Sequence, residues 1–220
     1  MRFRIVSAVC ALIAAGVLTG CGDGSGGLPD AGLMMRDAAI SAGAIGSAHV
    51  ALRADGSVPG FPLRALEADV SKSDGGSATG AATLPTGSVT RFVASQGKVF
   101  SKSDNGTLVP MPAGFPSPSG LIGRDGGLAQ LLRSLRDPKT VARAQFTGVD
   151  AFEIEAVVPA RALAAILPGT TSDSTLTVWV PVRGAHLPLQ TTLGFPQHPD
   201  AHLNVTVSKP QSASVPGIKS

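Results

Sequence analysis

The sequence predicts an α+β fold in which a strongly curved antiparallel β-sheet, a half-barrel, carries short helices on its concave face. About nine short segments alternate apolar and polar residues with a period of two, which is typical of strands with one buried face. Turn signals separate these segments at regular spacing, which favours meanders. Three helical segments are available to cover the apolar face, and a sheet with so many strands coils strongly.

The chain begins with a predicted lipoprotein signal peptide at residues 1–20. Two arginines precede an uncharged apolar run of 13 residues, Ile5 to Val17, and Leu18-Thr19-Gly20-Cys21 has the form of a lipobox. The apolar run is shorter than the roughly 20 residues that a transmembrane helix requires. We therefore expect lipidation of Cys21, anchoring at the outer, extracytoplasmic face of the cell membrane, and a flexible tether at residues 21–28.

The charge and cysteine content of the chain disfavour some classes of function. The chain has 18 Lys and Arg against 15 Asp and Glu, and two of the basic residues lie in the signal peptide, so the mature balance of 16 − 15 = +1 gives no indication of nucleic-acid binding. Cys10 leaves with the signal peptide and Cys21 is lipidated, so the folded domain has no thiol for a disulfide or a nucleophile. Residues 29–209 suffice for one domain, and we expect a polar, disordered tail at 210–220.

The first half of the domain is predicted to contain one helix and five strands. Asp30 is the expected N-cap of a helix at 31–45, with Leu33, Ile40 and Ala44 on one face. The strands are expected at 48–55, 66–71, 77–84, 88–95 and 98–103, and the turn Ser103-Asp104-Asn105-Gly106 closes the last. A loop rich in proline and glycine follows at 107–124.

The second half is predicted to begin with a short helix that Asp125 caps and Pro138 ends, with an apolar stripe formed by Leu128, Leu131, Leu132 and Leu135. A strand at 152–158 leads to a helical segment that begins at Pro159 and carries Leu163, Ile166 and Leu167. The last three strands are expected at 175–180, 187–195 and 203–207.

The sequence offers no convincing catalytic or metal-binding constellation. It has no G-x-S-x-G elbow. Ser47 and His49 share a strand face, but no third group is indicated, so we interpret them as surface polar residues. His198, Asp200 and His202 resemble a metal-binding cluster, although a proline and a loop context oppose convergent imidazoles. We therefore expect no metal, no cofactor and no enzymatic activity.

Several short motifs occur in a characteristic order. These are Leu28-Pro29-Asp30, Ser47-Ala48-His49-Val50, Val58-Pro59-Gly60, Thr177-Val178-Trp179-Val180 and Leu187-Pro188-Leu189. With the lipobox, they make the chain resemble the mycobacterial and actinobacterial lipoproteins LppX, LprA, LprF and LprG over about residues 28–208. The resemblance implies a large hydrophobic cavity inside the half-barrel and non-catalytic transport of acylated lipids or lipoglycans through the envelope. It also implies an integral membrane lipid exporter as partner.

From the residues alone, the interior is either a fully packed core or a core with a cavity, and the resemblance favours the cavity. The parity of the strands and the leucine stripe selects candidate lining residues, which are Val50, Leu52, Leu66, Val70, Leu132, Leu135, Ile154, Leu176, Val178, Leu189 and Val205. Two other functions remain open. One is a structural or adaptor lipoprotein that recruits a protein partner through its sheet edge or proline-rich loop, and the other is an esterase.

Overall fold

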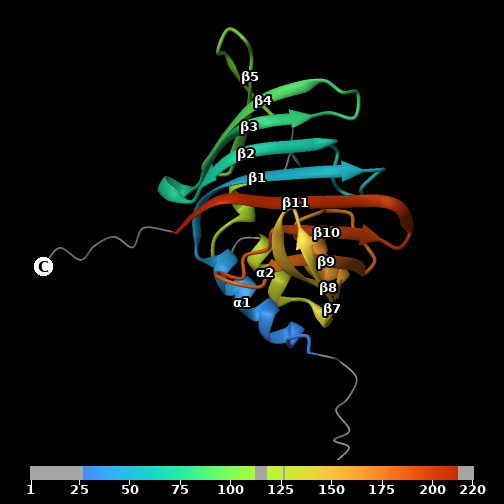
Figure 1. Cartoon of the computed structure of the whole chain (residues 1–220). Helices are drawn as coiled ribbons and strands as arrows, with labels where there is room; N and C mark the ends of the chain where they lie inside the picture. Colours follow the sequence, from blue (N-terminus) through green and yellow to red (C-terminus); the bar gives the residue numbers. More distant parts are fainter. Residues whose placement is uncertain (1–26, 112–117, 126, 213–220) are drawn as a thin grey trace, which may run out of the picture.

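The computed structural model describes residues 27–111, 118–125 and 127–212 (Figure 1). The expected signal peptide, Cys21 and most of the tether lie outside these residues. In the described part of the chain, no helix combines the length and the apolar character needed to cross a membrane.

The eleven described strands form one antiparallel sheet in the order β6-β5-β4-β3-β2-β1-β11-β10-β9-β8-β7. The first meander consists of β1 (Ile45–Asp55), β2 (Ala65–Ser71), β3 (Ser77–Thr83), β4 (Val89–Ser95), β5 (Lys98–Lys102) and β6 (Leu108–Pro110). The second consists of β7 (Arg136–Phe146), β8 (Val149–Val158), β9 (Ser174–Pro181), β10 (Gln190–Phe195) and β11 (His198–Ser212). The sheet is open and strongly curved, which confirms the predicted half-barrel (Figure 1).

The two meanders meet where β1 pairs with β11. Val50 lies opposite Val207, and Leu52 lies opposite Val205. The inner residues of β1, such as Val50 and Leu52, are buried, as the alternation predicts. The centre of the sheet is therefore built from the first and the last strand of the domain.

The helical segments are α1 (Ala31–Gly43), η1 (Ser73–Gly75), η2 (Pro118–Leu121), α2 (Gly127–Arg133) and α3 (Ala160–Ala164). Asp30 caps α1 as predicted, because its Oδ1 accepts a hydrogen bond from Leu33 N at 2.8 Å. Helix α1 packs on α2, and both lie on the concave side of the sheet (Figure 1). One apolar core fills most of the space between these layers.

The apolar face predicted for α1 is not the face that packs inward. Leu33 and Ile40 are 60% and 68% exposed, whereas Ala38 and Ala39 are almost fully buried. Ala44 is exposed and lies just beyond the helix. The buried face consists of four alanines together with Met34 and Met35, and small alanine side chains let a helix approach its neighbours closely.

Two strands were missed, β6 and β7. Strand β6 lies inside the segment predicted to be a loop, together with η2. The helix expected to run from Asp125 to Pro138 ends at Arg133, and Pro138 lies in β7. Both strands are edges of the sheet. An edge strand tolerates proline and needs no continuous apolar alternation, so the period-two signal is weak there.

The last strands also differ from the prediction at their ends. Strand β10 begins at Gln190 rather than 187, although Leu189 N still donates to Trp179 O at 2.8 Å. Strand β11 begins at His198 and continues to Ser212, so the first three residues of the expected tail belong to a strand. Pro210 lies in the register shift between the pairs Ser47–Gln211 and His49–Ser208 of the β1–β11 ladder, and such irregularities tolerate proline.

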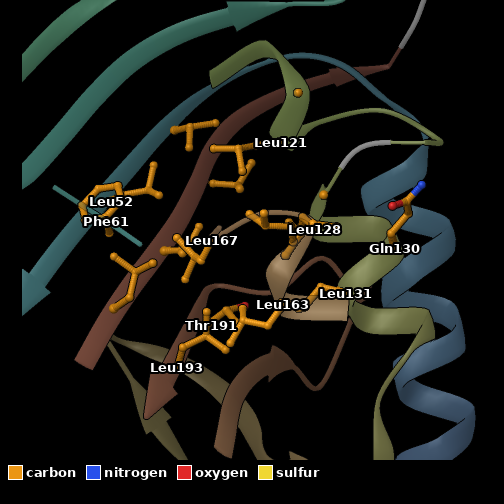
Figure 2. Close-up of a pocket in the computed structure, with 18 of the residues that line it drawn as sticks. Leu52, Phe61, Leu121, Leu128, Gln130, Leu131, Leu163, Leu167, Thr191 and Leu193 are labelled. Carbon is orange, nitrogen blue, oxygen red and sulfur yellow. The ribbon is translucent and has the colours of Figure 1, made fainter. Parts of the chain in front are cut away.

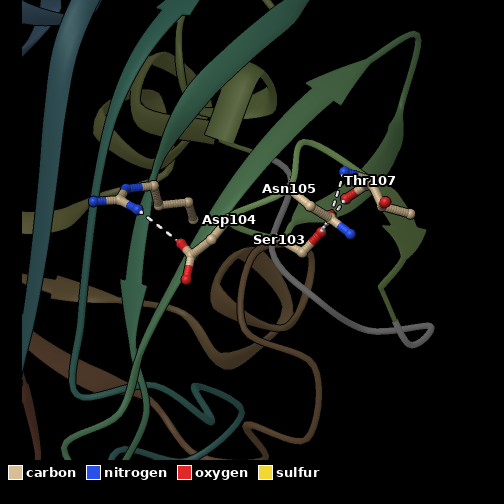
Figure 3. A network of polar contacts seen from close by, with 5 residues as sticks. Ser103, Asp104, Asn105 and Thr107 are labelled. Carbon is tan, nitrogen blue, oxygen red and sulfur yellow. Dashed lines mark hydrogen bonds and ion pairs between the residues drawn. The ribbon is translucent and has the colours of Figure 1, made fainter.

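The turn between β5 and β6 follows the predicted motif (Figure 3). Ser103 Oγ donates to Thr107 O at 3.0 Å, and Thr107 N donates to Asn105 Oδ1 at 3.0 Å. Asp104 pairs with Arg91 at 3.4 Å. Side chains of the turn therefore form hydrogen bonds with its own backbone groups.

Candidate functional site

An apolar cavity of about 330 Å³ lies between the concave face of the sheet and its helical cover (Figure 2). Its floor is the centre of the sheet, where β2, β1, β11 and β10 lie side by side. Alternate residues of these strands point toward the cavity. The floor residues are Val50, Leu52, Leu66, Thr191, Leu193, Leu203, Val205 and Val207.

The cover of the cavity comes from three short helical segments and the connection between β1 and β2. Leu128 and Leu131 belong to α2, Leu163 belongs to α3, and Leu121 ends η2 (Figure 2). The other cover residues are Phe61, Gly120, Asp125, Gly127, Gln130, Ala165, Ile166 and Leu167.

Phe61 is brought to the cavity by a close approach of two backbones. Gly60 has a φ of +73°, and any Cβ at this position would collide with the carbonyl group of Pro168. Glycine is therefore needed for both the backbone conformation and the contact. The contact places Phe61 beside Leu167 over the cavity floor, where both side chains are buried.

The cavity wall contains few polar groups. Thr191 is 2% exposed and stands in β10 between Val178 of β9 and Val205 of β11. Gln130 and Asp125 belong to the cover and are exposed. An apolar wall with so few hydrogen-bonding groups suits a hydrocarbon ligand rather than a polar one.

The family model of the LppX_LprAFG lipoproteins matches residues 30–213. The chain belongs to this family. A relative, the lipoarabinomannan carrier protein LprG of Mycobacterium tuberculosis, is 31% identical over 201 aligned positions, which cover 84% of this chain and 82% of the relative.

Two crystal structures of LppX_LprAFG proteins have the same fold. LprF from Mycobacterium bovis matches with a TM-score of 0.72 at 19% identity, over 86% of this chain and 97% of LprF. LppX from Mycobacterium tuberculosis matches with a TM-score of 0.66 at 20% identity, over 84% of this chain and 96% of LppX. Both confirm the half-barrel architecture that the resemblance implied.

In this LppX_LprAFG member, four of the residues selected by parity lie together on the cavity floor: Val50, Leu52, Leu66 and Val205. Others are buried in the core away from the cavity wall, namely Val70, Leu132, Ile154, Leu176 and Val178. Leu135 and Leu189 are half-buried. The lipidation candidate Cys21 lies outside the described residues.

Sequence reasoning did not select several lining residues. Leu193, Leu203 and Val207 follow the same alternation as Val205, so parity alone could have found them. Thr191 has the right parity but a polar side chain. Phe61 lies in a connection without periodicity, and its position depends on the packing of Gly60.

The polar groups considered for catalysis lie on the face of the sheet opposite the cavity. Ser47 Oγ donates to Gln211 Oε1 at 3.2 Å, whereas His49 Nδ1 lies 2.9 Å from Asp69 Oδ1. The Ser47 hydroxyl therefore has an amide oxygen rather than an imidazole as its partner.

The residues considered for metal binding lie at the start of β11. His198, Asp200 and His202 are exposed there. The described residues contain no group of three or more side chains arranged to hold a metal ion.

Asp173 stabilises the cover at α3. The pKa of its carboxyl group lies below the ordinary value of 3.8, mainly because Ala160 N donates a hydrogen bond to Oδ1, at 2.8 Å. Arg136 of β7 pairs with the same carboxylate and lowers the pKa further. Asp173 thus connects the start of α3 to the edge of the sheet.

Proposed function

We propose that this LppX_LprAFG lipoprotein binds acylated lipids or lipoglycans in the concave-face cavity and carries them across the cell envelope without catalysis. The observation that carries the proposal is the cavity itself, whose wall is mostly apolar. Val50, Leu52, Leu66 and Val205 would contact the acyl chains directly. The printed name of the LprG relative, a lipoarabinomannan carrier, supports the same ligand class.

Energetics support a carrier rather than a permanent binder. Transfer of one CH₂ group from water is worth about 0.8 kcal/mol, so a 16-carbon chain gains on the order of 12 kcal/mol. A bilayer offers nearly the same gain, so exchange between the bilayer and the cavity has a net free energy close to zero. Cargo can then be loaded and released reversibly.

The size of the cavity sets a further requirement. Its volume of about 330 Å³ lies at the lower end of the range for small-molecule sites. Cargo with two or three acyl chains therefore requires outward movement of the cover. The segments α2, α3 and η2 are only 7, 5 and 4 residues long, so their displacement breaks few backbone hydrogen bonds.

The proposed anchor places the cavity near its cargo. Lipidation of Cys21 would hold the domain at the outer face of the membrane, because two or more acyl chains anchor a protein stably. An integral membrane lipid exporter is the proposed source or destination of the cargo. We propose no catalytic step, and Ser47 and His49, the pair considered for catalysis, lie on the face opposite the cavity.

The test uses residues 22–220, produced without signal peptide or anchor in a host rich in acylated lipids. Comparison of native and denatured masses would detect co-purified ligand, and solvent extraction would identify it. We expect a stoichiometric mass excess that resolves into acyl-chain lipids. No excess, and no uptake of added glycolipids, would refute the carrier function and favour the adaptor function.

A further inference from the structure

Three basic residues lie beside η2 and α2, two of the segments that cover the cavity. Lys72 follows β2 directly, Arg124 precedes the cavity residue Asp125, and Arg133 ends α2. All three are exposed. We propose that Lys72, Arg124 and Arg133 form a binding site for a phosphate group carried by the lipid headgroup. This inference rests on the proposed lipid-carrier function and defines the class of cargo.

Lys72 is fixed against the cover. Its aliphatic chain crosses Gly123, where an added Cβ would lie 2.9 Å from Lys72 Cε, and Gly123 has a φ of +89°. Lys72 Nζ lies 3.4 Å from Ser119 O. The next two residues, Gly120 and Leu121, line the cavity (Figure 2). The ammonium group is therefore held beside the cavity while its stem packs on the protein.

The Arg133 side chain is held against the main chain of Arg124. Arg133 Nη1 donates to Arg124 O at 2.9 Å, which joins the end of α2 to the segment before it. The rest of the Arg133 guanidinium group keeps donors for a ligand, and guanidinium groups match phosphate oxygens well.

Among the side chains that the structure describes, no carboxylate neutralises these three charges. Asp125 is the acidic residue of the cavity lining beside them, so three basic residues stand next to one acidic lining residue. One amphipathic lipid could place its hydrocarbon chain in the apolar cavity and its phosphate group beside the three basic residues.

The test measures competition for the full-length lipoprotein, purified in detergent. Equimolar dipalmitoyl phosphatidylglycerol, dipalmitoyl phosphatidylcholine and dipalmitoylglycerol are added, and native mass spectrometry measures the bound ratio. Exposed ion pairs are individually weak, so three together predict a preference of about tenfold for phosphatidylglycerol over dipalmitoylglycerol. The preference should fall at high salt because screening weakens exposed charge pairs.

The decisive variant combines K72Q, R124Q and R133Q. We expect it to lose the preference for phosphatidylglycerol while binding dipalmitoylglycerol as before. The control combines R53Q, R64Q and K102Q, which removes the same charge from exposed residues on strands or connections away from these three residues. The control should keep the preference.

The outcomes separate this inference from the carrier function. Equal binding of all three lipids, or a preference that survives in the K72Q, R124Q and R133Q variant, would overturn the phosphate site and leave the carrier function intact. Failure of every lipid to bind would overturn both. Excess inorganic phosphate should compete only weakly; if it binds as tightly as phosphatidylglycerol, the cluster is a free-phosphate site and the lipid assignment is wrong.

Discussion

A Val205→Phe substitution should block the cavity without unfolding the protein. Val205 is half-buried, lies on the cavity floor in the central strand β11, and faces Leu52 of β1 and Thr191 of β10. Phenylalanine adds four carbon atoms to this side chain. If these atoms displace about four methylene groups of the cargo, at about 0.8 kcal/mol each, binding weakens by about 3 kcal/mol, or roughly two orders of magnitude.

The assay is displacement of a fluorescent acyl lipid, together with the thermal midpoint of each variant. Phenylalanine is well accepted in strands and would fill existing space, so the midpoint should remain close to that of the unsubstituted protein. Val93→Phe is the matched control, because Val93 is half-buried on β4 and does not line the cavity. Unchanged lipid binding by Val205→Phe would refute the assignment of this cavity as the acyl site. Equal losses in both variants would point to a global effect and refute it as well.

Three further substitutions test separate parts of the argument. Asp30→Ala should cost about 1 kcal/mol of stability in urea unfolding, because it removes the cap on Leu33 N; an unchanged midpoint would contradict the capping role. Thr191→Val should strengthen acyl-lipid binding by about 1 kcal/mol, because it removes a buried hydroxyl from an apolar wall, and weaker binding would mean that the hydroxyl contacts the cargo. Asp173→Asn should destabilise the fold at pH 7. Because the pKa of Asp173 in the folded protein lies below 3.8, the stability that its carboxylate contributes is complete above pH 3.8 and is lost as the pH falls through the folded pKa. The difference in unfolding free energy between the two proteins should therefore shrink in acid. A difference that does not change with pH would contradict this role of the carboxylate.

The central strands could be predicted from the sequence because burial on one face imposes a period of two. On β1 and β2 the buried residues alternate with exposed or half-buried ones along nearly the whole strand, as for Leu52 and Leu66. Strand β7 lacks this signal, since it is an edge strand and most of its residues are exposed. Helix α1 is predicted through its cap, but its buried face is not, because alanines together with Met34 and Met35, rather than Leu33 and Ile40, pack inward.

The cavity wall could be predicted only in part, because parity identifies a face but not a position along it. Leu66 and Val70 share the inner face of β2 and are both buried, yet only Leu66 lines the cavity. Four residues of strand separate them by about 13 Å, enough to pass from the cavity to the packed core. Which part of the floor stays open depends on where α2, α3 and Phe61 lie, and that follows from long-range packing.

The position of the cavity at the junction of β1 and β11 ties cargo binding to the completion of folding. Leu203, Val205 and Val207 of β11 form part of the floor, and Val207 pairs with Val50, which precedes it by 207 − 50 = 157 residues. Contacts between residues so far apart in the sequence form late in folding, because the entropy lost on closing a long loop must be compensated before these contacts stabilise the chain. A chain that lacks β11 has the cover segments and the first meander but no continuous apolar floor. If the proposed carrier function holds, an acyl chain is therefore enclosed only after the last strand has joined the sheet, and a partly folded chain is unable to take up lipid.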